Sequence, residues 1–232
     1  MYTCPMCKQS LAANEGACDW CAVQLAPGTH GVPEAVLPPI HPGRRIAIRD
    51  FTHAPLPTLS GRDFKWDDGD RTEAHHHGVL LTLNDGIRRF SEPYLRMRDG
   101  VVRLMFDVLD AKTRVRVVAR KQDIGDAALW YELSLWCDER TFRLSRYFTS
   151  KHLSDGTELA SGKHPVVRGV GETNVLELRV QGPTIEGWVN GSRVCATHDA
   201  ALGIGAVAIA AGTDEKQRRI LFRSFEVMEV AP

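Results

Sequence analysis

The chain has 232 residues, 43% of them hydrophobic, enough to bury the core of one large domain or of one domain with a small appendage. Its 29 basic and 29 acidic residues cancel, so no overall field favours binding to nucleic acid or to an anionic membrane. No apolar run approaches the roughly 20 residues of a membrane-spanning helix. The N-terminal sequence MYTCPMCK lacks the charged and apolar regions of a signal peptide, which predicts a cytoplasmic protein.

Four of the six cysteines form two C-x2-C pairs near the N-terminus. The pairs are Cys4 with Cys7 and Cys18 with Cys21, separated by ten residues. Each pair places two thiolates on one side of a tight turn, and the loop between the pairs closes a tetrahedral site. Because four thiolates leave no open coordination position, the spacing predicts a structural zinc ion and not a catalytic one.

Two disulfides or a redox dithiol are the alternatives at these cysteines. Disulfides need an oxidising compartment, and a thioredoxin-like pair needs a βαβ context; the sequence indicates neither. The arrangement is similar to the short zinc ribbons at the ends of many bacterial multidomain proteins, although those usually carry Gly where this chain has Lys8 and Ala22. Residues 1–25 are therefore expected to form a ribbon whose fold depends on the metal. Cys137 and Cys195 lie in strand-like runs and are expected to be small buried side chains.

Residues 26–43 contain five of the twelve prolines and show no hydrophobic periodicity. Proline removes backbone donors and favours extended chain, so this segment is predicted to be a semi-rigid linker. His30 and His41 fall within it and are expected to be solvated.

From residue 44 to residue 232 the pattern is that of β-strands. Short alternating runs are separated by turn signals, and no segment has the length and periodicity of an amphipathic helix. This spacing predicts an all-β, two-sheet antiparallel sandwich. Strands are expected at 45–49, 78–83, 94–98, 101–109, 113–120, 128–137, 140–148, 174–181, 184–190, 193–197, 205–211 and 219–229.

The run EAHHH at residues 73–77 is a candidate transition-metal site, because imidazole binds zinc, copper and nickel. Adjacent strand residues point to opposite faces, so His75 and His77 could share a metal only if His76 points away. A loop or strand start leading into the next strand is the simpler interpretation.

Asn174 to Val194 has the pattern of a β-meander. Its first strand alternates Leu and Val with polar residues, and Gly182-Pro183 then breaks the run. Alternation resumes and ends at Asn190-Gly191, a pair that tolerates the positive φ angles of a two-residue hairpin turn.

This meander, with the Asp, the Gly-rich strand and the Phe-containing strand that follow it, resembles the end of a concanavalin A-like (laminin G-like) jelly-roll domain. The matching residues are Asn174, Leu176, Val189-Asn190-Gly191, Asp199, Gly203, Gly205 and Phe222 to Val227. Upstream, Arg120 and Tyr131 stand where bacterial members related to the 3-keto-disaccharide hydrolase group often have an Arg and a Tyr. The resemblance covers residues 44–232 and implies a jelly-roll fold more than a function.

Laminin G-like domains sometimes carry calcium at their rim, and Asp67, Asp68 and Asp70 offer the oxygen ligands that calcium prefers. Their spacing, however, is not that of an EF-hand loop. A solvated turn is the simpler interpretation of this cluster.

Alternation also sorts the side chains of the central strands into two faces. One face is apolar and is expected to form the core, whereas the other carries aromatic, arginine and glutamate side chains. Aromatic rings stack on sugars while Arg and Glu hydrogen-bond hydroxyls, and many relatives of the resembled fold bind carbohydrate on a sheet face. The candidate ligand-binding residues are Arg120, Trp130, Glu132, Trp136, Arg143, Tyr147 and Trp188.

A structural role is the alternative for these residues. The aromatic side chains can pack under loops such as 149–172, and Arg120 can form an ion pair with Glu132.

Catalytic motifs are missing from the sequence. Glycosidases of this fold place two or three carboxylates at alternate positions of one strand, whereas Glu132 stands alone on its strand. There is no G-x-S-x-G elbow, no phosphate loop and no dinucleotide fingerprint.

Three functions are consistent with these patterns. The first is a non-catalytic module that binds a glycan or a protein partner; the second is a glycoside hydrolase using Glu132 with another carboxylate; the third is a structural component of an assembly. Lys8 is the only Lys or Arg before Arg44, which speaks against nucleic-acid binding by the ribbon.

Overall fold

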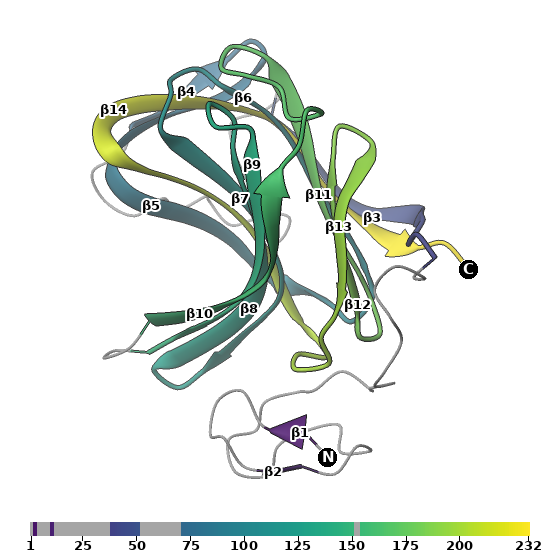
Figure 1. Cartoon of the computed structure of the whole chain (residues 1–232). Helices are drawn as coiled ribbons and strands as arrows, with labels where there is room; N and C mark the ends of the chain where they lie inside the picture. Colours follow the sequence, from purple (N-terminus) through teal and green to yellow (C-terminus); the bar gives the residue numbers. More distant parts are fainter. Residues whose placement is uncertain (1, 4–9, 12–37, 52–70, 151–153) are drawn as a thin grey trace.

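The computed structural model describes residues 2–3, 10–11, 38–51, 71–150 and 154–232, and all of their regular structure is β (Figure 1). This part of the chain contains no helix that could cross a membrane. The strands are β1 (Tyr2–Thr3), β2 (Ser10–Leu11), β3 (Pro42–Asp50), β4 (Arg71–His75), β5 (Gly78–Met97), β6 (Gly100–Val108), β7 (Thr113–Ile124), β8 (Ala127–Trp136), β9 (Thr141–Thr149), β10 (Ser154–Lys163), β11 (Thr173–Gln181), β12 (Thr184–Val189), β13 (Ser192–His198) and β14 (Gly205–Val230).

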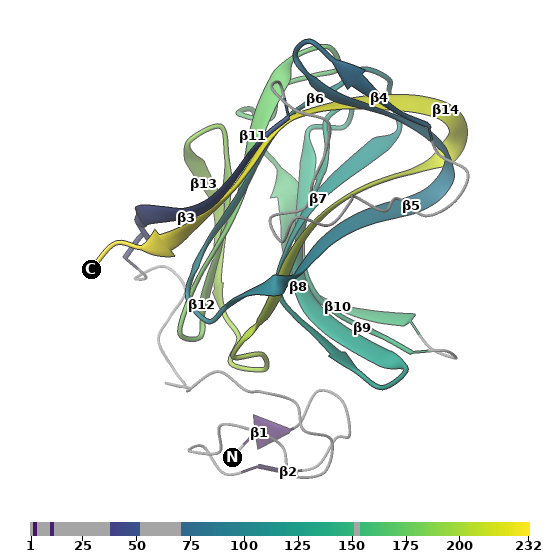
Figure 2. The same ribbon diagram turned by 180° about the vertical axis from the view of Figure 1, so that it is seen from behind.

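One antiparallel sheet of twelve strands bends over on itself to give two packed layers, and β1 pairs with β2 separately. The first layer has the order β10-β9-β8-β7 and continues into the first half of β14, which pairs with β7 and β5. The second half of β14 pairs with β6 and β3, and this second layer continues through β11, β12 and β13. Figures 1 and 2 show β5 and β14 as long curved bands that pass from one layer into the other. The predicted all-β jelly-roll sandwich is confirmed.

The core lies between the two layers. On β6, β8 and β11 every second side chain is apolar and buried, because successive residues of a strand point to opposite faces. The fully buried core side chains include Leu104, Phe106, Tyr131, Leu133, Leu135, Leu176, Leu178, Phe222 and Phe225. Burial of this continuous apolar surface is the main contribution to the stability of the sandwich.

Both turns of the predicted meander are confirmed. Asn190 and Gly191 have φ values of 49° and 80° and join β12 to β13. Gly182 has a φ of 53° and joins β11 to β12. Positive φ at these positions is available to Gly and Asn at little cost.

Four strands differ from those expected. The expected strands 78–83 and 94–98 are parts of the single strand β5, 205–211 and 219–229 are parts of β14, and β4 was not expected as a separate strand. The strand β10 lies within 149–172, which the sequence indicates as a loop because it shows no apolar alternation; in the structure its residues are mostly exposed. It pairs with β9 alone and lies at the sheet edge, so backbone hydrogen bonds rather than burial hold it in place.

The two asparagines of the meander motif have structural roles. Asn174 Oδ1 accepts hydrogen bonds from the backbone N of Arg168 at 3.0 Å and from Asn190 Nδ2 at 2.9 Å. Asn190 Oδ1 in turn accepts from the backbone N of Val175 at 2.8 Å. These bonds connect the loop before β11 to the β12–β13 turn.

Arg120 lies in the interior and not on the face expected for it. A bulge between Ala119 and Gln122 interrupts the pairing of β7 with β8, and Arg120 adopts a φ of 52° within it. The guanidinium, which has no exposed surface, donates to the backbone oxygens of Arg98, Leu202 and Gly182 at 2.7, 2.8 and 2.7 Å and contacts Asp99 Oδ1 at 3.2 Å. Arg120 therefore pairs with Asp99 and with turn carbonyls instead of Glu132.

Tyr131 completes this buried polar network. Its hydroxyl donates to Asp199 Oδ1 at 2.7 Å and accepts from the backbone N of Leu202 at 3.1 Å. Burial, followed by the nearby Asp199 carboxylate, raises the pKa of Tyr131 well above its ordinary value, so the phenol stays protonated. The jelly-roll resemblance thus singled out three residues with structural roles. They are Arg120, Tyr131 and Asp199, which connect strands and loops at one end of the sandwich.

Replacing Arg120 by Met keeps much of the side-chain volume but removes the donors to three backbone carbonyls. We expect the free energy of unfolding to fall by about 3 kcal/mol or more, because buried acceptors lose charged partners. Urea denaturation followed by tryptophan fluorescence measures this change. Arg219→Met, which removes a half-exposed ion pair with Asp110, is the matched control, with an expected loss below about 1 kcal/mol. Equal losses would contradict the structural role of Arg120.

Candidate functional site

The side chains of β7–β10 that point away from the core form a surface that we call the outer face. Strand register arranges it in rows that cross the four strands. The first row is Arg114, Trp136, Thr141 and Lys163; the second is Arg116, Ser134, Arg143 and Ser161; the third is Val118, Glu132, Ser145 and Glu158; and Trp130, Tyr147 and Gly156 form the fourth.

Five residues of the first two rows line a depression of about 290 Å³. Its lining residues are Trp136, Glu139, Thr141, Phe142, Arg143, Ser161, Gly162 and Lys163. The indole of Trp136 is partly exposed, and the guanidinium carbons of Arg114 and Arg143 lie 5.2 and 5.5 Å from its ring centroid. This end of the outer face thus combines an accessible aromatic ring with hydroxyl and cationic donors.

The third and fourth rows are packed and closed. Glu132 is 1% exposed and accepts hydrogen bonds from Ser134 Oγ at 2.7 Å and Trp130 Nε1 at 3.1 Å. Its Oε1 lies 3.3 Å from Nε of Arg116, which is also buried. The Trp130 ring is buried as well and stacks on Tyr147 with a centroid separation of 5.6 Å. These side chains stabilise one another, although the partners differ from those of the structural alternative: Glu132 pairs with Arg116 and not with Arg120, and Trp130 packs on Tyr147.

Five of the seven candidate ligand-binding residues therefore share the outer face. Trp136 and Arg143 border the depression, whereas Trp130, Glu132 and Tyr147 belong to the packed rows. The other two, Arg120 and Trp188, lie elsewhere. The other six lining residues were not among the candidates. Ser161, Gly162 and Lys163 were missed because β10 has no apolar alternation to reveal it.

Trp188 lies on the outward surface of the second layer. Its Nε1 donates to Glu186 Oε2 at 2.7 Å, and the guanidinium carbon of Arg179 lies 3.7 Å from its ring centroid. The same two charged residues bind the backbone of Ile40, whose N donates to Glu186 Oε2 at 3.0 Å and whose O accepts from Arg179 Nη1 at 2.6 Å. Trp188 is therefore part of the contact that fastens the chain before β3 to the sandwich.

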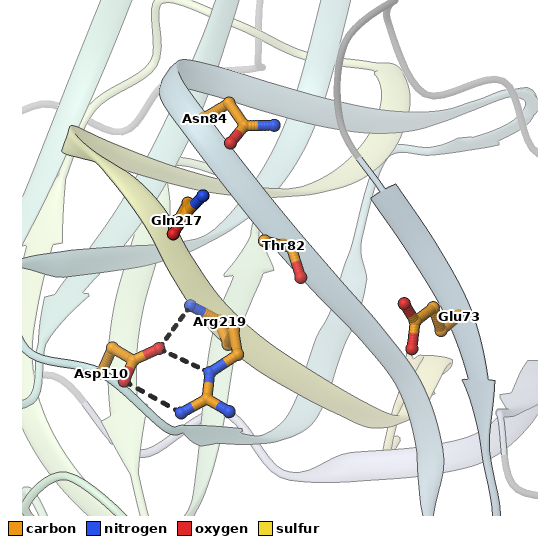
Figure 3. Close-up of a pocket in the computed structure, with 6 residues that line it drawn as sticks. All are labelled: Glu73, Thr82, Asn84, Asp110, Gln217 and Arg219. Carbon is orange, nitrogen blue, oxygen red and sulfur yellow. Dashed lines mark hydrogen bonds and ion pairs between the residues drawn. The ribbon is translucent and has the colours of Figure 1, made fainter.

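A second depression of about 530 Å³ lies beside the bend of β5 and β14 (Figure 3). Its lining residues are Glu73, Thr82, Asn84, Asp110, Gln217 and Arg219. Arg219 donates three hydrogen bonds of 2.9, 2.9 and 3.2 Å to the Asp110 carboxylate, and these bonds lower the pKa of Asp110. The lining has no aromatic ring for stacking and its central carboxylate is already paired, so this depression is the weaker candidate.

The remaining sequence candidates divide into described and undescribed residues. His75 ends β4 and His77 lies in the turn to β5, where His75 Nδ1 accepts from the backbone N of His77 at 3.3 Å. No group of three or more metal-ligating side chains occurs among the residues that the structure describes. The aspartates at 67, 68 and 70 and the four N-terminal cysteines lie outside those residues.

The later cysteines, Cys137 and Cys195, are free thiols. Cys137 is buried as expected, whereas Cys195 is partly exposed. Burial raises the pKa of the Cys137 thiol to about 12, so this side chain is an unreactive part of the core.

Comparisons with known proteins identify the fold of the chain but not its family. No protein-family model and no curated protein sequence matches the chain. The structure is similar to the carbohydrate binding module CBM66 from Bacillus subtilis, with a TM-score of 0.55 and 13% identity over 72% of this chain and 92% of that chain. A protein of unknown function with a galectin-like fold, also from Bacillus subtilis, gives a TM-score of 0.62 and 15% identity over 83% of this chain and 99% of that chain.

A Bacillus licheniformis β-glucanase has the same architecture, with a TM-score of 0.55 and 9% identity over 81% of this chain and 99% of that chain. Binding modules and enzymes thus share this fold, and at such identities the likeness establishes the fold alone. The chain is a jelly-roll protein of the concanavalin A-like and galectin-like type. Its function must be argued from the outer face.

The packing around Glu132 predicts that this residue stabilises the fold. Glu132→Gln keeps the shape and an acceptor oxygen but leaves the Arg116 guanidinium buried without its counter-charge. We expect the free energy of unfolding to fall by about 3 kcal/mol. The double variant Arg116→Met/Glu132→Met removes both charges and is expected to be more stable than the single variant in the same urea titration. If Glu132→Gln unfolds like the parent protein, Glu132 is not a structural residue and becomes available as a catalytic one.

Proposed function

We propose that the jelly-roll domain is a non-catalytic recognition module that binds a glycan on the outer face, at the depression beside Trp136. One observation carries the proposal: a partly exposed indole ring lines a depression together with hydroxyl, carboxylate and cationic side chains, beside Phe142 and Gly162. The solved carbohydrate binding module with the same fold is consistent with it.

The chemistry of this depression suits a saccharide. One face of a pyranose ring is a patch of C–H groups, which packs against an indole ring, while its hydroxyls project from the ring edge. Thr141 and Ser161 contribute hydroxyls, of which Ser161 Oγ donates to Glu158 Oε1 at 2.6 Å and can still accept from a ligand. Arg143 contributes N–H donors beside the same indole. A ligand held in this way is oriented by hydrogen bonds and desolvated on one face.

Glycoside hydrolysis is the second candidate, because the similar β-glucanase is an enzyme. Hydrolysis needs two carboxyl groups about 5 to 9.5 Å apart that are free to exchange protons or to attack the sugar. Of the carboxylates described in the rows of the outer face, Glu132 is buried beside Arg116, and Glu158 forms an ion pair of 3.2 Å with Arg143. Both already have cationic partners, and among the described residues only Glu139 borders the depression without one. A single such carboxylate favours binding over catalysis. A purely structural role in an assembly is the third candidate.

Trp136→Ala tests the proposed site directly. Loss of the stacking ring is expected to weaken glycan binding at least tenfold, while the melting temperature changes little because the ring is partly exposed. A broad glycan array followed by calorimetry on the full chain measures both effects. Trp188→Ala, on the second layer, is the matched control and should retain binding.

Loss of binding in both tryptophan variants would point to a change in the fold. Retained binding in Trp136→Ala would exclude this depression as the site. No glycan binding by the parent chain would favour a protein partner or a structural role.

For the N-terminal segment we propose a structural zinc ion bound by Cys4, Cys7, Cys18 and Cys21. The proposal rests on the spacing of the four thiolates. It is supported by the pairing of Tyr2 with Leu11 and of Thr3 with Ser10, which brings together the chain on either side of the first cysteine pair. Once bound, a zinc ion would link the two knuckles and replace a hydrophobic core that so short a segment lacks.

The metal is expected at about one zinc per chain, because one set of four thiolates closes one tetrahedral site. Elemental analysis of protein purified without added metal measures it, and Cys4→Ser/Cys7→Ser should abolish it. Chelation should leave the sandwich's thermal transition in place, because its described core uses none of these cysteines. Disulfide-bonded protein without zinc would support the alternative pairing.

A further inference from the structure

The Trp136 end of the outer face is rich in cations. Arg114 and Arg143 flank the indole ring, and Lys163 borders the same depression. Arg143 is paired with Glu158 at 3.2 Å, but both side chains are about half exposed, so water and ligands compete readily for this contact. Within the described part of the chain, neither Arg114 nor Lys163 has a carboxylate partner.

The carboxylates near this end do not cancel these charges. Glu139 borders the depression, and its Oε2 is 3.5 Å from Thr141 Oγ1. Glu132 and Glu158 lie in the third row, and each is already bound by an arginine. Across the first three rows and this rim, four cations face three carboxylates. Of the two cations without a carboxylate partner among the described residues, Arg114 lies over the partly exposed Trp136 ring and Lys163 borders the same depression.

Arg116, in the second row, provides an independent observation. It is 3% exposed, and only its Nε side approaches Glu132, at 3.3 Å. Its Nη2 is buried and has no hydrogen-bond acceptor among the described residues. Arg116 does not line the depression, so it adds positive charge beneath the outer face without itself reaching a ligand bound there.

We propose that the glycan bound beside Trp136 is acidic, carrying carboxylate or sulfate groups on its sugar units. This inference rests on the proposed glycan-binding function and specifies its ligand class. The indole packs against the apolar face of one sugar unit. The anionic groups around that unit form ion pairs with Arg114, Arg143 and Lys163. Guanidinium groups suit this task, because their paired N–H donors match the two oxygens of a carboxylate or sulfate.

Matched ligand pairs that differ only in charge test the ligand class. The full chain is titrated with an oligogalacturonate and its methyl ester, and with a sulfated galactan oligosaccharide and its desulfated form. We expect one acidic ligand to bind at least tenfold more tightly than its neutral counterpart, and the preferred pair distinguishes carboxylate from sulfate. Its affinity should fall several-fold between about 50 and 300 mM salt, because these charges are solvent-accessible and screened.

Matched charge variants test the location of the site. Arg114→Gln/Lys163→Gln removes two cations beside Trp136 and should lower the affinity for the acidic ligand at least tenfold. Arg44→Gln/Arg45→Gln removes the same net charge from β3, where both side chains are more than half exposed, and should leave the affinity unchanged. Melting curves of both double variants confirm that the fold is intact.

The outcomes separate this inference from the function on which it rests. Equal binding of neutral and acidic ligands would overturn the acidic ligand class and leave glycan binding in place. Acidic binding that survives Arg114→Gln/Lys163→Gln would overturn the assignment of these cations. No binding of any glycan would overturn both proposals. Tighter binding of single-stranded DNA than of every acidic glycan would show that the cations serve a phosphate polymer instead.

Discussion

The buried guanidinium of Arg120 is the interaction on which one end of the sandwich depends. It donates to backbone oxygens from three connections: the β5–β6 turn, the β11–β12 turn and the loop before β14. Turn carbonyls lack the strand partners that satisfy the rest of the sheet, and a planar group with five donors can serve several of them at once. Gly205 permits the close approach, because a Cβ there would lie 2.4 Å from the backbone carbon of Arg120.

This network and the two long strands together fix the geometry of the outer face. Because β5 and β14 pass through both layers, the layers cannot slide past each other without breaking pairs in both. Arg120 lies near the end of β7, in the bulge opposite Trp130, whereas Arg114 and Trp136 lie at the other end of the β7–β8 pair. The Arg120 network and the depression thus lie at opposite ends of the β7–β8 pair. The network makes one end of this pair rigid, and the pair positions the Trp136 ring at the other end.

Residue alternation and turn residues predicted most of the strands and turns. The features that they did not predict depend on burial, on a bulge and on which strands share a layer. The meander and its turns were predictable because Gly182, Asn190 and Gly191 have the conformations that their residue types favour. β10 was not, since an exposed edge strand has no apolar face. Arg120 was predicted on the wrong face because the alternation rule assumes an unbroken strand. The bulge adds one residue to β7, so the side chains after it point to the opposite face from the one that alternation predicts. Trp188 was grouped with the wrong sheet because sequence alone does not state which strands share a layer.

Burial also separates two tryptophans that the sequence treats alike. Trp130 and Trp136 lie on one strand and on one face, yet Trp130 is 4% exposed and Trp136 remains partly open. Trp130 stacks on Tyr147 and donates to Glu132, so its polar and apolar surfaces are both satisfied within the protein. Trp136 ends its strand, with Arg114 on one side and Thr141 on the other, and no described aromatic ring stacks on it. A partly exposed ring between two guanidinium groups can gain free energy when a ligand covers its remaining exposed surface, and the same neighbours favour a ligand of opposite charge.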